Sequence, residues 1–204
     1  MATSTHASYD ALAWRRWATQ HRLASAMLAG LIGVHIASIL GFWFGSFGLT
    51  RLDWNTANGL VYWPDGAPMQ QFLVGWTMHY IDGVVFAVLF AVALHPLMPW
   101  RNTIVGNLAK ALVFGTILAV VALLIMTPLV YAPARGVEAG FFSSNFGWQY
   151  ILGNFLFHWA YGLHLGLIYN PLPDDEAEDI TGPRSMARSS ERVPGRPGGT
   201  PDDR

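Results

Sequence analysis

The chain has 204 residues, of which 52% are hydrophobic and only 12% are charged, about half the charged share of an ordinary soluble domain. Its formal net charge of −1 gives no basis for a nucleic-acid partner. The sequence contains no cysteine, which excludes disulfides, thiolate metal sites, iron–sulfur clusters and haem attached through cysteine.

Four long apolar stretches, separated by polar connections, fill most of the chain. They cover residues 23–47, 72–97, 104–131 and 148–169. Each exceeds the about 20 apolar residues that a helix needs to cross a bilayer. The sequence therefore predicts an all-α integral membrane protein, in which residues 23–170 form an up-down bundle of four transmembrane helices in the lipid bilayer of the cell inner (cytoplasmic) membrane.

The segments outside the predicted spans indicate the orientation. Residues 1–22 carry Arg15, Arg16 and Arg22 directly before the first span, and the cations of the later connections alternate as the positive-inside rule requires. We therefore expect both termini on the cytoplasmic side, with residues 1–22 as a cytoplasmic or interfacial segment. Residues 174–204 are rich in Pro, Gly, Ser and Arg, and their composition predicts a disordered cytoplasmic tail.

The first connection, residues 48–71, is the only long one. It contains Trp54, Tyr62 and Trp63 and is too aromatic for a plain flexible linker. We expect it to fold back onto the outer surface, as a lid, a partner surface or an interfacial anchor.

Small residues recur every four positions within the spans and therefore share one face of each helix. They include Ala29, Gly33, Ala37, Gly41 and Gly45 in the first span, Gly75, Gly83, Ala87 and Ala91 in the second, Ala111, Gly115 and Ala119 in the third, and Gly162 and Gly166 in the fourth. Helices associate in lipid through close packing of such residues, which predicts a compact bundle.

Ionisable residues inside a span are costly, and each one raises a functional hypothesis. His79 and Asp82 lie three apart and can meet on one helical face. Counting about 1.5 Å per residue from the outer ends of the spans places His35, His79 and His158 in one layer of the membrane. The alternative for His35 is that it points away from the other two, because it lies about 200° around its helix from Gly33 and Ala37, on a bulkier face.

Three functional hypotheses follow from these residues. His79 and His158 on facing helices could be the axial ligands of a b-type haem. Together with Asp82 and His35 they could bind a transition metal, because imidazole suits zinc, copper and iron. His and Asp in series could also carry protons, which makes a proton- or ion-coupled carrier centred on Asp82 the third hypothesis.

A purely structural role is the alternative. His79 can hydrogen-bond Asp82, and His158 can bond Asn154, a tyrosine or a carbonyl. Asp82, Asn154 and Tyr161 would then form a buried polar network that holds the bundle together.

Three sequence pieces resemble a known kind of protein. They are H-Y-I-D-G-V-V-F-A at 79–87, M-T-P-L at 126–129 and H-W-A-Y-G-L-H-L-G-L-I-Y at 158–169. Together they resemble small uncharacterised four-helix membrane proteins of bacteria and archaea, whose last helix carries the pattern H-x-x-Y-G-x-x-L-G-x-x-Y.

The resemblance covers residues 72–170, about half of the chain. It implies a four-helix membrane fold in which His79, His158, Tyr161 and Gly162 belong to a recurring framework, and it implies no activity. The chain shows no catalytic motif, so we expect a small accessory or scaffolding subunit rather than an enzyme, with other membrane subunits or a second copy as its partner.

Overall fold

The computed structural model describes residues 3–173, 175 and 176, which form helices and connecting loops with no β-strand among them. Four helical segments are long and apolar enough to cross a membrane, which confirms the predicted helical class with four candidate spans. They are Arg22–Phe47, Pro68–Leu97, Ile104–Ala134 and Trp148–Ile168. Apart from residues 175 and 176, the predicted tail at 174–204 lies outside the described residues.

Each of the first three candidate spans consists of an α-helix followed by shorter helical turns, whereas the fourth is a single α-helix. In chain order the elements are α1 (Thr3–Gln20), α2 (Arg22–Trp43), η1 (Phe44–Phe47), α3 (Trp54–Tyr62), α4 (Pro68–Leu89), η2 (Phe90–Leu94), η3 (His95–Leu97), α5 (Ile104–Val121), η4 (Ala122–Tyr131), α6 (Ala132–Ala134), η5 (Phe141–Phe146) and α7 (Trp148–Ile168).

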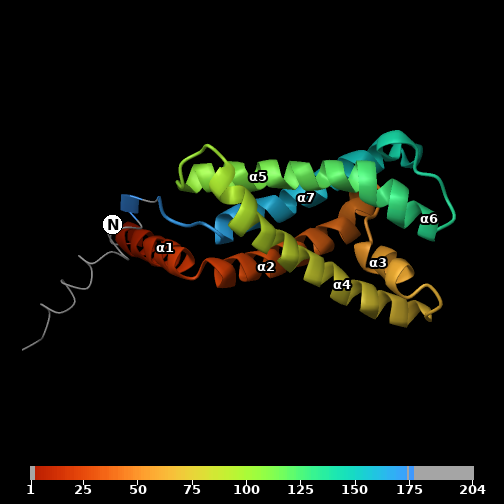
Figure 1. The fold of residues 1–204 in the computed structure, drawn as a ribbon, viewed down its shortest axis with the longest axis horizontal. Coiled ribbons are helices and arrows are strands. Elements are labelled where there is room, and N and C mark those ends of the chain that lie inside the picture. The colour runs from red at the N-terminus through yellow and green to blue at the C-terminus, as the bar shows by residue number, and fades with distance from the viewer. Residues whose placement is uncertain (1–2, 174, 177–204) are drawn as a thin grey trace, which may run out of the picture.

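The helix packing leaves α4 and α5 on the two outer sides of the bundle. α2 packs against both α4 and α7, and α5 packs against α7. Although α4 and α5 are joined by a short connection, Figure 1 shows that they diverge from the end at which this connection lies. The divergence positions the site described below, because the opposite ends of α4 and α5 are held apart.

Glycines set the closest helix approaches. A Cβ added at Gly30 on α2 would lie 2.6 Å from the carbonyl oxygen of Gly83 on α4, and one added at Gly162 on α7 would lie 2.5 Å from that of Ala111 on α5. No real side chain tolerates such contacts with a backbone, so these crossings require glycine. Gly83, Gly115 and Gly162 of the predicted rows thus lie where helices touch, whereas Gly45 has no atom within 4 Å of an added Cβ, and Gly30 lies outside the predicted row.

α3 occupies the long first connection. Asp53 begins the helix as its N-cap, accepting a hydrogen bond from the backbone N–H of Thr56 across 3.0 Å. The helix then lies against α4 so closely that a Cβ at Gly75 would collide with the backbone carbonyl of Asn55. The first connection therefore folds back as a helix, with Trp54, Asn55 and Asn58 buried.

η4 continues the third span as a π-helix, and Pro128 lies inside it. Proline has no N–H to donate to the carbonyl of Leu124 four residues earlier, and its ring clashes with that carbonyl, which disfavours the regular α-helical ladder. Next to Pro128, the hydroxyl of Thr127 lies 2.9 Å from that of Tyr150, which joins this π-helical turn to α7. Such π-helical turns occur frequently at functional sites.

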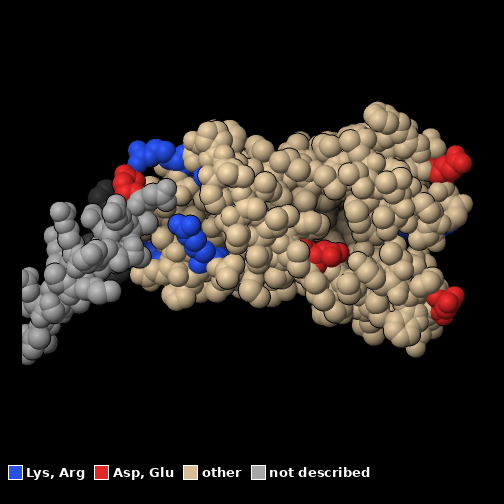
Figure 2. Space-filling view, in the orientation of Figure 1, with Lys and Arg blue, Asp and Glu red and all other residues tan. Residues whose placement is uncertain are grey.

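Charged side chains gather at the two ends of the molecule. Figure 2 shows Lys and Arg with an acidic group beside them at the end where α1 lies, one acidic group midway along the molecule, and further acidic groups at the opposite end. At the first end Arg15 donates to the carbonyl oxygens of Asn102 and Pro171, which joins α1 to the α4–α5 connection and to the chain after α7. At the other end Arg51 lies 3.6 Å from Asp53.

Candidate functional site

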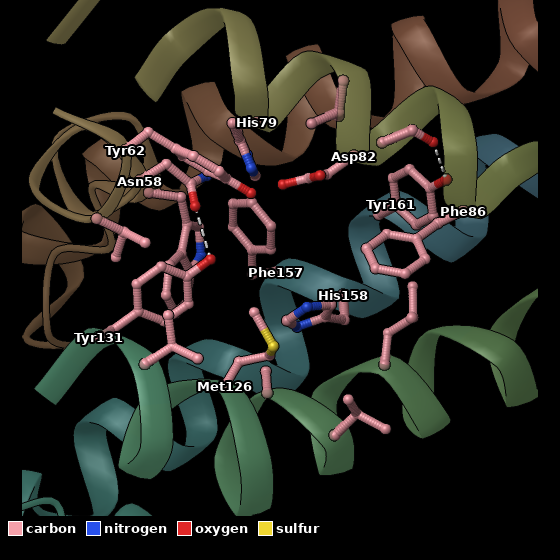
Figure 3. Close-up of a pocket in the computed structure, with 18 residues that line it drawn as sticks. Asn58, Tyr62, His79, Asp82, Phe86, Met126, Tyr131, Phe157, His158 and Tyr161 are labelled. Carbon is pink, nitrogen blue, oxygen red and sulfur yellow. Dashed lines mark hydrogen bonds between the residues drawn. The ribbon is translucent and has the colours of Figure 1, made fainter. Parts of the chain in front are cut away.

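A cavity of about 170 Å³ lies where α4 and α5 diverge. α3, α4, α5, η4 and α7 contribute most of its wall, and Val34 of α2 completes it. Figure 3 shows its side chains. Most of the lining is apolar or aromatic, and the polar or ionisable members are Trp54, Asn58, Tyr62, His79, Asp82, Tyr131, His158 and Tyr161.

α3 supplies two hydrogen-bond donors that have no partner. Trp54 and Asn58 are four residues apart and share one helical face, and they are only 8% and 2% exposed. Tyr131 of η4 donates to Asn58 Oδ1 across 2.7 Å, as Figure 3 shows. This bond leaves Asn58 Nδ2 without a partner, and Trp54 Nε1 has none either.

α4 brings an imidazole and a carboxylate to the same cavity. His79 Nε2 is buried and has no hydrogen-bond partner. Figure 3 shows the His79 ring, the Asp82 carboxylate and the Tyr62 hydroxyl pointing toward one another. No hydrogen bond joins these three groups in the described part of the chain, so the predicted bond between His79 and Asp82 is not formed.

α7 supplies the second imidazole. His158 Nδ1 lies 2.8 Å from the backbone oxygen of Asn154, which can only accept, so Nδ1 carries the proton. In a neutral imidazole Nε2 then keeps its lone pair and can accept a hydrogen bond or bind a metal. Phe157 lies between the two imidazoles in Figure 3, and its ring centroid is 5.9 Å from that of His79 and 5.3 Å from that of His158.

The structure brings together three of the four predicted metal ligands. His79, Asp82 and His158 line one cavity, whereas His35 lies outside it, exposed on the surface of α2 with its Nδ1 2.6 Å from the hydroxyl of Tyr80. Among the described residues, no group of three or more His, Asp or Glu is placed to hold one metal ion.

The predicted polar network of Asp82, Asn154 and Tyr161 is divided into separate contacts. Tyr161 donates to the backbone oxygen of Gly83 across 2.6 Å, which joins α7 to α4. Asn154 Nδ2 donates to the backbone oxygen of Tyr150 across 3.0 Å, and its Oδ1 is buried without a partner. Within the described residues no hydrogen bond connects Asp82 to either of them.

The sequence analysis did not identify Trp54, Asn58 and Tyr131 as site residues. A signal for the first two was present, since Asp53 and Thr56 form a helix start and place Trp54 and Asn58 on one face of the helix that follows. Their neighbour Tyr131 comes from the third span, and only the fold brings it to Asn58.

The unpaired polar atoms are costly as they stand. A buried polar group without a partner costs about 1–3 kcal/mol, and Trp54 Nε1, Asn58 Nδ2 and His79 Nε2 all belong to residues that line this one cavity. An engineered cavity of about 150 Å³ binds benzene, so the space suits a single small ring.

Comparison with known proteins gives one match. Residues 20–180 match the model of a family whose description is "Family of unknown function (DUF6789)". The match contains every residue that lines the cavity. No curated protein and no solved structure matches the chain.

Proposed function

For this chain, which belongs to the DUF6789 family of unknown function, we propose that it binds a small lipid-soluble molecule in the cavity between α4 and α5. The observation that carries the proposal is the cavity of about 170 Å³ itself, which is lined mostly by apolar and aromatic side chains together with His79, Asp82 and His158. A concave, mostly apolar pocket with a few polar side chains is the usual form of a small-molecule site.

The proposed setting is the inner membrane, which the four apolar spans cross as an up-down bundle with both termini in the cytoplasm. The outer surface of the spans supports this setting, since large apolar side chains such as Leu31, Val92 and Ile117 are exposed there. The charges support the orientation. Arg22 and Arg101 line one pocket with Asn102 at the end proposed as cytoplasmic, and Arg15 donates to the backbone oxygen of Asn102 there.

The cavity opens sideways, toward the lipid. Phe86 of α4 and Tyr62 of α3 line it and are 38% and 51% exposed. Figure 2 shows a hollow beside an acidic group midway along the molecule. Asp82 is the only acidic residue of the four candidate spans. A molecule dissolved in the bilayer can therefore reach the cavity without crossing the bundle.

The cavity bears differently on the accessory-subunit hypothesis and on the haem hypothesis. An accessory subunit remains compatible with it, because the bound molecule could serve a partner chain. A haem held between His79 and His158 is not proposed, since Phe157 lies between the rings and the cavity has room for about one small ring.

A second candidate function is proton or ion coupling at Asp82. It is favoured by one observation: this carboxylate is half-buried beside the cavity, with no hydrogen-bond partner in the described residues. The test is a pH-dependent flux in proteoliposomes, which Asp82→Asn should abolish. A flux that survives this substitution would remove Asp82 from the role.

The test of ligand binding compares two equal substitutions on α5. Val121 lines the cavity, whereas Val113 is exposed on the outer surface. Solvent extracts of purified wild-type protein, analysed by mass spectrometry, should contain a stoichiometric small molecule. Val121→Phe should remove it by filling the cavity, and Val113→Phe should retain it. Wild-type protein that yields no bound molecule, or equal amounts in both variants, would contradict the proposal.

A further inference from the structure

The pocket that Arg22 and Arg101 line has a volume of about 340 Å³ and lies at the end of the molecule where α1 contacts the α4–α5 connection. Its wall comes from the start of α2, the segment from η3 to Asn102, the first two turns of α5, and the chain after α7. All four candidate spans therefore begin or end near this pocket. In a bilayer this position is the level of the lipid head groups.

Three cationic side chains line the pocket. They are Arg22, Arg101 and Lys110, and Asp175 is the only acidic member among the described residues. Arg22 and Arg101 are exposed, whereas Lys110 is buried and donates to Asn102 Oδ1 across 2.7 Å. The wall thus carries more positive than negative charge, which attracts an anion.

The ion pair between Arg101 and Asp175 shows how an anion is held at this wall. Both carboxylate oxygens of Asp175 accept from Arg101 Nη2, across 3.2 and 2.9 Å. The two side chains are 73% and 67% exposed, so water screens the pair and it is weak. A phosphate group presents the same kind of charged oxygen and can bond a guanidinium through two parallel hydrogen bonds. It can therefore replace the Asp175 carboxylate, and the other two cations add to its attraction.

Apolar side chains beside these cations favour a lipid over a soluble phosphate. Met98 and Trp100 line the pocket, and Trp100 is exposed. Leu97 and Ile104, at the adjacent ends of two candidate spans, are exposed as well. Tryptophan is enriched where a membrane meets water. The exposed apolar ends of the spans give acyl chains a surface to lie on.

We propose that this pocket binds the phosphate group of an anionic phospholipid, with Arg22 and Arg101 as its main contacts. Basic pockets between transmembrane helices on the cytoplasmic side are a recurrent form of site for anionic head groups. The site shares no lining residue with the cavity between α4 and α5. It therefore stands whether or not that cavity binds a ligand.

The experiment compares two lipids with the same acyl chains. Dioleoylphosphatidylglycerol has a net negative charge, whereas the choline of dioleoylphosphatidylcholine balances the charge of its phosphate. Delipidated full-length protein in detergent is titrated with each lipid and observed by native mass spectrometry. The first phosphatidylglycerol molecule should bind at least about fivefold more tightly than the first phosphatidylcholine molecule. Equal dissociation constants for the two lipids would overturn the proposal.

Substitutions at the pocket test its residues. Arg22→Gln and Arg101→Gln should each weaken phosphatidylglycerol binding about fivefold, since each removes one cation near the phosphate. Asp175→Asn should strengthen it by about twofold, because it removes the carboxylate that competes for Arg101. Arg51→Gln is the matched control: Arg51 is also exposed and lies beside an aspartate, but at the opposite end of the molecule, and binding should not change.

Two results with these variants would also overturn the proposal. One is wild-type affinity in both Arg22→Gln and Arg101→Gln, and the other is a loss in Arg51→Gln as large as that in Arg101→Gln. Thermal unfolding checks that each variant is folded. Both pocket arginines are exposed, and if one variant fails to fold, the other keeps the test valid.

Inorganic phosphate distinguishes the lipid from a soluble ligand with the same chemistry. Because it lacks acyl chains, it should bind the delipidated protein more weakly than phosphatidylglycerol does in a calorimetric titration. If it binds as tightly as the lipid and Arg101→Gln weakens it, the pocket is a site for a soluble phosphate and the lipid assignment is overturned.

Discussion

The hydroxyl of Tyr131 donates to the amide oxygen of Asn58 across 2.7 Å, joining residues 73 positions apart in the chain. One partner comes from the helix in the first connection and the other from the π-helical end of the third span. The bond fixes which end of the Asn58 amide remains unpaired. The Asn58 Nδ2 group is therefore left buried without a partner, at the wall where α3 meets the cavity.

Removal of this bond should affect both stability and binding. Tyr131→Phe removes the hydroxyl that donates to Asn58 Oδ1 and should lower the free energy of unfolding by about 1 kcal/mol. It should also weaken ligand binding, because the amide can then rotate. Thermal unfolding and the amount of small molecule extracted from the purified variant measure the two effects. Tyr80→Phe is the control: it breaks the contact with His35 on the outer surface and should leave binding unchanged.

The α5–α7 crossing should not accept a methyl group. In Gly162→Ala the added Cβ would lie 2.5 Å from the Ala111 carbonyl oxygen, so the two helices must separate, at a cost of about 1–3 kcal/mol. Gly45→Ala is the matched control, because nothing lies within 4 Å of its Cβ. Thermal unfolding in detergent should show a lower midpoint for Gly162→Ala only. Equal midpoints would contradict the tight crossing.

Pro128 should control the shape of the cavity. Pro128→Ala restores an N–H that can donate to the Leu124 carbonyl, which favours a regular α-helix and turns Met126 and Tyr131 to new positions. We expect weaker ligand binding with no loss of thermal stability. Pro133→Ala serves as the control, because Pro133 lies in the first turn of α6, where proline is tolerated. Unchanged binding in Pro128→Ala would show that the π-helical turn does not shape the site.

The proposed orientation can be measured with single cysteines, since the chain has none of its own. Glu138→Cys, in the exposed connection before α7, should react with a membrane-impermeant maleimide added to intact spheroplasts. Arg101→Cys, in the exposed connection between α4 and α5, should react only after the membrane is permeabilised. The reverse pattern would place both termini outside.

The composition and the apolar stretches were sufficient to predict the helical class and four candidate spans, and the structure confirms both. They also indicated His79, Asp82 and His158, because an ionisable group in an apolar span stands out by its cost. His35 was assigned to the same layer by depth, but depth along a helix does not fix rotation about its axis. Its side chain is exposed on the outer surface, away from the cavity.

The sequence by itself determined which segments are helical and which polar groups lie among apolar ones, because helix length and composition are local properties of the chain. The tertiary structure decided which polar groups meet. Trp54 and Asn58 line the site because α3 lies against α4 at Gly75. Tyr131 lines it from η4, the π-helix that contains Pro128. Contacts of this kind depend on how each helix is rotated about its axis and on the angle at which two helices cross. Close contacts between residues far apart in the chain set both, and the local sequence pattern does not contain them.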